Sequence, residues 1–368
     1  MRTAPRRPSG VSSASCSCCS QPSRGAVGTS REVGAILTIA FVVACGGSTS
    51  AVAPAQPAAV VAPAPPVHTP EFAAGVSAFD QGDYVGAKAS FETAFKGNPQ
   101  DYEALWNLGQ ACEKLGDNQS AATAYRAEIA IKPDADRAFA ELATLYVAEG
   151  NTDKALATAS EGLANRPGSA VLHGAMGLAL ATRGDKDTAM QQFVQAIQLD
   201  GRDPNLEYLV AVWLNRWHER GAAAHLDLAL PLVLNDYAMV VSIGHEYRMA
   251  GEFDSCVRTL STAIQARDGG EARTERALCK LGLKDETAAL SDLKNAVTVE
   301  PNYPQAHFFL AGRLAGTTHY REAAEEYAIY LRLAPEGSLA EQASVRLAAA
   351  QDAAAHEKET TASKKKAR

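Results

Sequence analysis

The chain has 368 residues, of which 46% are hydrophobic and 21% charged, and its formal net charge is −7. This composition excludes a protein that is disordered throughout, and the length allows a sizeable core. Aromatic residues are scarce at 7%, whereas alanine is abundant, which favours helices packed closely through small side chains. Beyond residue 44, 30 basic groups stand against 41 acidic groups. A chain with this excess of acidic groups is not expected to bind nucleic acid.

Residues 1–44 predict an export signal rather than part of a folded domain. Residues 33–44 form an uncharged apolar run, shorter than the roughly 20 residues that span a bilayer, and Arg24 and Arg31 precede it as in a secretory signal. The residues VVACG at 42–46 resemble a bacterial lipobox. That resemblance implies cleavage before Cys45 and its lipidation, and Gly46 implies the outer membrane. Because the stretch before the run is long for a signal, translation is expected to start later.

Residues 45–69 are expected to form a linker between the lipid anchor and the folded part. The segment is dominated by Ala, Pro and Val, and proline at this density disfavours helix and favours an extended chain. Signal and linker together predict a lipid-anchored protein of the bacterial cell envelope, on the outer membrane and facing the periplasm. If the apolar run is not a signal, the protein is instead cytosolic.

From residue 68 onward the sequence repeats with a period of about 34 residues. The skeleton of residues 102–135 is Leu105, Leu108, Gly109, Gly116, Ala121, Tyr125 and Pro133. It resembles the tetratricopeptide (TPR) repeat, a helix-turn-helix unit. The resemblance implies an all-α fold, an α-solenoid in which about eight such repeats and a C-terminal capping helix form a right-handed superhelix.

Three columns recur in register along the array. A small residue recurs at Gly75, Gly109, Ala143, Gly177, Ala211, Gly244, Ala277 and Ala311. A large residue that fills the gap beside it recurs at Phe91, Tyr125, Phe193, Leu260, Leu293 and Tyr327. A turn glycine recurs at Gly82, Gly116, Gly150, Gly184 and Gly251. Two helices can cross closely only at small residues, and glycine adopts positive φ at low cost, so these columns are expected to be structural.

The array is regular in residues 70–203 and degenerate in residues 204–303. In the fifth repeat, Asp227 stands at the large position and Pro231 lies inside the second helix. The seventh repeat has charged residues at core-type positions, namely Arg273, Arg276 and Lys280. This stretch either continues the array or bends it between two sub-arrays. An eighth repeat is expected at 304–337, a capping helix at 338–356 and a basic, disordered tail at 357–368.

The sequence carries little that could perform chemistry. It has no P-loop, HExxH or GxSxG pattern, so the protein is expected not to be an enzyme and to hold no cofactor or metal. The alternative is an enzyme site in residues 204–270, where the repeat decays around Trp213, Trp217, His218 and His225.

Three cysteines lie in the array. Cys112 and Cys256 fall on core columns, where a cysteine acts as a small buried hydrophobe. Cys256 and Cys279 lie in adjacent repeats, and in an oxidising compartment they could instead form a disulfide.

The expected activity is binding of a partner in the concave groove of the array. TPR arrays hold partners against exposed residues of each first helix, and the register places these here at Phe72, Phe79, Trp106, Gln110, Leu178, Tyr208, Asn215, His245, Arg248 and Phe308. The family's carboxylate clamp uses Lys and Asn, but Phe72 and Val76 occupy those first-repeat positions, so that clamp is not expected. The aromatic, apolar lining predicts a protein or peptide with an amphipathic or apolar segment, rather than a small-molecule substrate. Alternatively, some of these rings pack against the next repeat.

The layout of lipobox, linker and array resembles TPR lipoproteins of the pilotin type and those that serve outer-membrane assembly. The resemblance implies a lipid-anchored scaffold that binds a protein during assembly of an envelope complex. The alternative is a cytosolic TPR adaptor.

Overall fold

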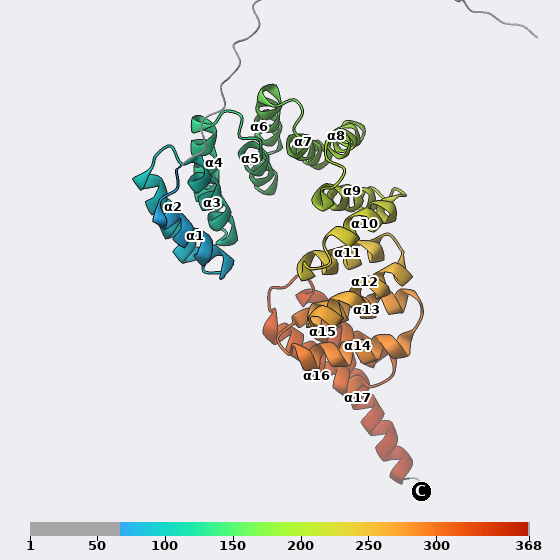
Figure 1. Cartoon of the computed structure of the whole chain (residues 1–368). Coiled ribbons are helices and arrows are strands. Elements are labelled where there is room, and N and C mark those ends of the chain that lie inside the picture. The colour runs from blue at the N-terminus through green and yellow to red at the C-terminus, as the bar shows by residue number, and fades with distance from the viewer. Residues whose placement is uncertain (1–66, 367–368) are drawn as a thin grey trace, which may run out of the picture. The chain divides into compact units, whose positions relative to one another are not determined.

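The structure is a computed structural model that describes residues 67–366, and every regular element in that range is helical (Figure 1). Sixteen of the α-helices form eight consecutive pairs, and α17 follows them. The pairs are α1 (Pro70–Asp80) with α2 (Tyr84–Gly97), α3 (Tyr102–Lys114) with α4 (Asn118–Ile131), α5 (Asp136–Ala148) with α6 (Thr152–Asn165), α7 (Ala170–Arg183) with α8 (Lys186–Leu199), α9 (Pro204–Arg216) with α10 (Ala222–Ala229), α11 (Tyr237–Met249) with α12 (Phe253–Ala266), α13 (Gly270–Gly282) with α14 (Glu286–Val299), and α15 (Pro304–Gly316) with α16 (Tyr320–Leu333). The predicted all-α solenoid is confirmed.

The expected signal and the lipidation site Cys45 lie outside the described residues. Of the expected linker, only residues 67–69 are described, and they precede α1. Within residues 67–366, no helix has both the length and the apolar character needed to cross a bilayer.

The two helices of a pair cross where the small column meets the large column. A Cβ built on Gly75 would lie 2.7 Å from ring atoms of Phe91, and one built on Gly244 would lie 2.6 Å from Leu260. No side chain fits at such a distance, so the large residue of the second helix requires glycine opposite it here. The predicted crossing is confirmed.

The turn between the two helices contains a residue with positive φ at one fixed position of every pair, and the fifth pair has a second such residue, Gly221. In five pairs it is the predicted glycine, as at Gly116, where φ is 73°. At the corresponding positions of the other three pairs, His218, Lys284 and Thr318 adopt φ of 56°, 63° and 62°. The turn geometry is therefore kept even where the sequence departs from glycine.

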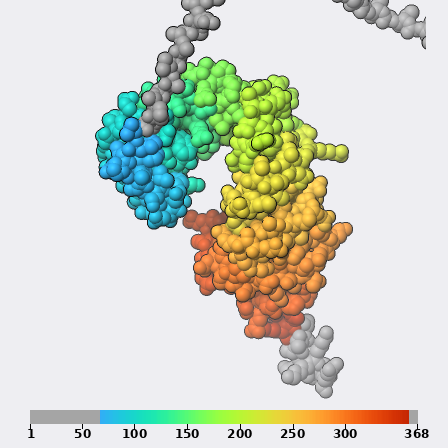
Figure 2. Space-filling view, viewed as in Figure 1, coloured from blue at the N-terminus to red at the C-terminus, as the bar shows by residue number. Residues whose placement is uncertain are grey.

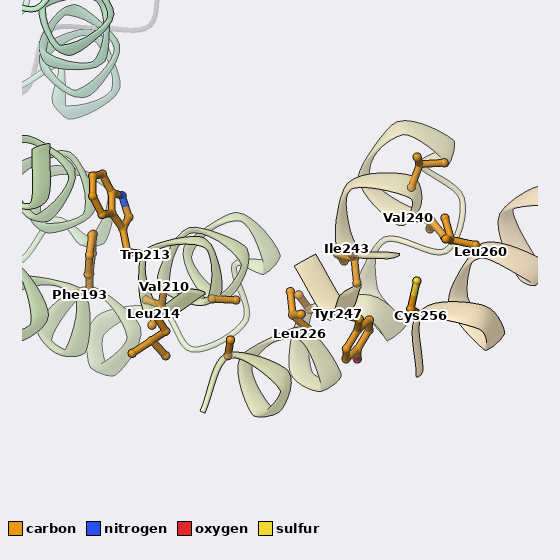
Figure 3. Packing of buried hydrophobic residues seen from close by; sticks show 14 of the residues in the cluster. Phe193, Val210, Trp213, Leu214, Leu226, Val240, Ile243, Tyr247, Cys256 and Leu260 are labelled. Carbon is orange, nitrogen blue, oxygen red and sulfur yellow. The ribbon is translucent and has the colours of Figure 1, made fainter. Parts of the chain in front are cut away.

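Neighbouring pairs pack against each other in chain order: α2 contacts α3, α4 contacts α5, and α12 contacts α13. The space-filling view shows their side chains in continuous contact (Figure 2). The largest buried cluster extends from Leu180 on α7 to Cys279 on α13 and includes Phe193, Trp213 and Tyr247 (Figure 3). One core thus passes through the degenerate repeats, as stacking of repeats requires.

The fifth pair shows how a degenerate repeat is accommodated. Helix α10 ends at Ala229 and a 3₁₀ turn, η1 (Leu230–Leu232), follows it. The turn contains Pro231, which has no N–H to continue an α-helix. Asp227 cannot fill the gap as an aromatic ring would, and its carboxylate accepts a 2.6 Å hydrogen bond from the hydroxyl of Tyr247.

In the seventh pair, charged residues form a buried ion network around Asp292, which is 3% exposed. Arg276 donates two hydrogen bonds to Asp292, of 2.8 and 2.7 Å, and Lys280 donates one of 2.7 Å. Burial acts to raise the pKa of Asp292, but these hydrogen bonds outweigh it and lower the pKa. Arg276 and Lys280, which are charged residues at core-type positions, therefore have a structural partner on α14.

Cys256 on α12 and Cys279 on α13 form a disulfide, with 6.2 Å between their Cα atoms. Both cysteines are fully buried. The bond links the sixth pair to the seventh, which is one of the two outcomes the sequence left open. Cys112 is a free, buried thiol.

The C-terminal helix differs in its bounds from the capping helix expected at 338–356, and it includes residues 357–366 of the tail that was expected to be disordered. Helix α17 begins at Ala340 and continues to Lys366 (Figure 1). Alanine, glutamate and lysine dominate this stretch, and they are strong helix formers whose propensity outweighs mutual repulsion of the terminal lysines. Its first part packs on α16 and buries Ala343, as a cap should.

Candidate functional site

The first helix of each pair carries the residues expected to line a binding groove. Eight of the ten are partly exposed: Phe72, Phe79, Trp106, Gln110, Leu178, Tyr208, His245 and Arg248. The other two, Asn215 and Phe308, are buried, at 8% and 3% exposure.

The burial of Phe308 and Asn215 differs from the expectation for a specific reason at each position. The ring of Phe308 packs between Tyr327 and Tyr330, with centroid distances of 5.7 and 5.5 Å. Asn215 donates hydrogen bonds from Nδ2 to the backbone oxygen and the carboxylate of Glu246, at 2.9 and 2.7 Å. Both side chains hold neighbouring helices together, so neither is available to a partner.

The two phenylalanines of α1 also make contacts within the protein. Phe72 stacks on His68 at 3.9 Å between centroids and meets Phe91 edge-on at 5.7 Å. Phe79 packs on Tyr84 at 5.2 Å. Only part of each ring remains open to solvent, and these ring contacts lie within the first repeat, whereas the alternative expected packing against the next repeat.

His245 and Arg248 lie together on α11 and share one partner on α13. Glu275 is 3.3 Å from His245 Nδ1 and 2.9 Å from Arg248 Nε. The hydrogen bond to Glu275 raises the pKa of His245. This cluster joins two first helices and leaves His245 partly exposed.

Trp106 lines a pocket of about 330 Å³ where α3, the end of α4 and the start of α5 meet. The other lining residues are Tyr102, Glu103, Asn107, Glu128, Lys132, Ala135, Asp136 and Arg137. Helix α3 makes few contacts with the next first helix, α5, as α1 does with α3 and α7 with α9, whereas α5 packs extensively on α7. The pocket therefore lies between two first helices that are not closely packed.

Glu128 lines this pocket from α4. Its column holds Ala94, Gly162 and Ala196 in the other regular repeats, and larger residues, Leu230 and Tyr330, in two later ones. At Gly162 an added Cβ would lie 2.8 Å from Leu172 on α7, so glycine permits that close approach. A glutamate in the same column is too large for it, and it is buried with only 5% exposure.

Two polar atoms of the pocket have no hydrogen-bond partner within the described part of the chain. They are Nε1 of Trp106 and Oε2 of Glu128, and both are buried. Burial raises the pKa of Glu128 to about 8, with Glu103 and Asp136 adding to the effect and Lys132 and Arg137 opposing it. At neutral pH this carboxyl is largely protonated. Sequence reasoning missed Glu128, although it carries a charge in a column of otherwise uncharged residues.

The residues considered for an enzyme site do not converge. His225 Nδ1 lies 2.6 Å from the carboxylate of Glu207, and His218 is an exposed turn residue. A polar pocket of about 510 Å³ beside the turn is lined by His218, Glu219 and Arg220, among others, but not by His225. Within residues 67–366, no three His, Cys, Asp or Glu side chains gather as a metal site would require.

Helix pairs, crossing glycines and positive-φ turns define a TPR α-solenoid, a protein-interaction scaffold. Residues 73–308 match the family model of the cilia and flagella-associated protein 70 C-terminal domain, and the chain belongs to this family.

Two kinds of comparison agree with this class. Over 234 residues the chain is 28% identical to the tetratricopeptide repeat and J domain-containing co-chaperone DNJ1 of Fusarium oxysporum; the match covers 62% of the chain and 40% of the relative. Yeast Tom70 has a similar structure, with a TM-score of 0.54 and 16% identity over 78% of this chain and 64% of that one. Cut9 of the APC/C hetero-tetramer Cut9–Hcn1 structure gives a TM-score of 0.51, with 13% identity over 75% of this chain and 54% of that chain. The structural likenesses concern the fold.

Proposed function

We propose that this protein is an adaptor that binds a segment of another protein along the first helices of its array. The observation that carries the proposal is the pocket between α3 and α5, where Trp106 and Glu128 each keep a buried polar atom without a partner within residues 67–359. A buried polar group without a partner is costly, so an arriving ligand that satisfies both atoms gains binding energy there. The co-chaperone relative supports a role in handling other proteins.

Selection of peptides tests the proposal. Short random peptides displayed on phage are selected on the purified protein, and enriched sequences are titrated against it by fluorescence anisotropy. Trp106→Ala is expected to weaken their binding by about tenfold or more, because it removes an aromatic anchor from the pocket. The matched control is Val194→Ala, which truncates a 46% exposed side chain on the second helix α8. Absence of enriched peptides, or equal losses in both variants, would contradict the proposal.

Whether the adaptor carries a lipid anchor is a separate part of the proposal. The residues VVACG at 42–46 favour an anchored scaffold for an envelope complex, whereas the co-chaperone relative fits the alternative, a cytosolic adaptor, better. Labelling of cells with palmitate distinguishes the two. Label on the wild type but not on Cys45→Ala supports the anchor, and absence of label on both supports the cytosolic adaptor.

A further inference from the structure

The pocket at Trp106 holds a hydrogen-bond donor without an acceptor and two cations, beside the carboxyl groups of Glu103, Glu128 and Asp136. Nε1 of Trp106 is a donor without an acceptor. Within the described residues, the ammonium of Lys132 and the guanidinium of Arg137 form no ion pair, and their contacts are with the rings of Tyr102 and Trp106, at 4.5 and 5.9 Å. The side-chain cations of Lys132 and Arg137 thus lie over aromatic rings and have no ion-pair partner within residues 67–359.

The acidic residues at the rim are already engaged. Glu103 Oε2 lies 3.2 Å from His68 Nε2. Asp136 accepts a 2.9 Å hydrogen bond from the hydroxyl of Ser169 and lies 3.7 Å from Arg166 Nε. Glu103 and Asp136 thus have contacts outside the pocket, whereas Lys132 and Arg137 have no ion-pair partner within residues 67–359 and can pair with an incoming anion.

The start of α5 adds no free positive charge, because Asp136 in its first turn accepts a 3.0 Å hydrogen bond from the N–H of Arg137 and balances the helix dipole there. The buried, unpartnered Glu128 carboxyl, which lines the same space, can donate a proton to a further hydrogen bond when it is neutral.

From these contacts we infer that the pocket receives an aspartate or glutamate side chain of the bound protein segment. Its carboxylate would accept from Nε1 of Trp106 and pair with Lys132 and Arg137. Helix pairs precede and follow the pocket in the array, so a segment that lies along the first helices continues on both sides of it. A side chain from the middle of a segment suits this position better than a chain end. The inference rests on the proposed function, because it names the chemistry of the partner at that site.

Titration of the full-length protein with a blocked glutamate tests the inference without knowledge of the partner. The probe is N-acetylglutamate N-methylamide, and its isosteric control is the corresponding glutamine. The readout is the indole N–H resonance of Trp106, assigned by its loss in Trp106→Phe. The glutamate is expected to shift this resonance saturably and the glutamine is not. Lys132→Gln with Arg137→Gln should weaken binding by about tenfold, whereas Lys294→Gln, an exposed control on α14, should leave it unchanged.

Proton linkage provides a second readout. The groups that face Glu128 are Lys132 on its own helix, Glu103 on α3, and Asp136 and Arg137 on α5. Ionisation of Glu128 places a second negative charge beside the ligand, so glutamate affinity should fall as pH rises through the Glu128 pKa of about 8. Glu128→Gln cannot ionise and should bind with little change across this range. Equal shifts with glutamine, or no saturable shift in a folded protein, would overturn the inference.

Peptides from the display selection separate failure of this inference from failure of the adaptor proposal. They are expected to be enriched in Asp or Glu, and replacing that acid by its amide should weaken binding by about tenfold. Peptides that bind but show no such enrichment would overturn the inference and leave the adaptor intact. Loss of binding only on amidation of the C-terminus would identify a chain end as the ligand and also overturn it. A failure to enrich any peptide would count against the adaptor itself.

Discussion

The ring of Tyr125 on α4 lies directly over Gly109 on α3, so that a Cβ built on Gly109 would be 2.6 Å from Cζ of the ring. Gly109→Ala should therefore force the ring or the helix to move, and we expect a loss of about 2 kcal/mol in the free energy of unfolding. Urea denaturation followed by circular dichroism measures it.

The control for this substitution is Gly312→Ala on α15. An added Cβ there would meet only the hydroxyl of Tyr327 at 3.6 Å, an ordinary van der Waals contact. Alanine also has the higher helix propensity, so the control should be neutral or stabilising by up to about 1 kcal/mol. If both substitutions cost the same, the crossing of α3 and α4 is not as tight as described.

Thr318 occupies the turn position that other pairs fill with glycine, and its φ is 62°. Positive φ costs a β-branched residue conformational free energy, whereas glycine adopts it without this cost. Thr318→Gly is expected to raise the unfolding free energy by about 1 kcal/mol. The reverse change, Gly116→Ala at φ 73°, should lower it by a similar amount. Thermal melts of both variants check the pair, and a destabilised Thr318→Gly would contradict the turn assignment.

Glu128 should make stability depend on pH in a direction opposite to that of most carboxylates. Its folded pKa is about 8, above the usual value of 4.5, so the folded state holds a proton that the unfolded state has lost. The contribution of protonated Glu128 to the free energy of unfolding is therefore fully present below pH 4.5 and is lost as pH rises to about 8. As pH rises across this window, the free energy of unfolding of Glu128→Gln should increase by a few kcal/mol relative to that of the wild type. Urea denaturation at each pH measures the difference. A difference that does not vary with pH would refute the assignment.

The disulfide between Cys256 and Cys279 closes a short loop, with a sequence separation of 23. Removing it with Cys256→Ala and Cys279→Ala should cost about 2–4 kcal/mol, mainly because the unfolded chain regains freedom. Tryptic mapping without reductant should recover the two cysteines in one linked peptide. Recovery of both as free thiols from protein made in an oxidising compartment would argue against the bond.

The repeat, its crossings and its turns could be predicted because each depends on residues within one period of the sequence. Gly109 faces Tyr125 in the same repeat, and Gly116 forms the turn between their helices. Such local pairs recur in register, so even a single sequence contains several independent copies of the same pattern.

The surface offered to a partner could be predicted only in part, because it depends on contacts between repeats. Phe308 is on the expected face but is covered by tyrosines of α16, and Asn215 is held by Glu246 on α11. The pocket at Trp106 needs side chains from α3, α4 and α5 together. The continuation of α17 to Lys366 reflects helix propensity, which a charge-based reading of the tail underestimates.

Site-specific photo-crosslinking in cells tests directly whether a protein partner lies along the first helices. A benzoylphenylalanine placed at Thr144, exposed on α5 and one repeat beyond Gln110, should capture a partner. The same probe at Thr123, exposed on the second helix α4, is the matched control and should capture little. A discrete crosslinked band from Thr144 that Trp106→Ala diminishes would support the account. Equal capture from both positions, or capture from Thr123 alone, would contradict it.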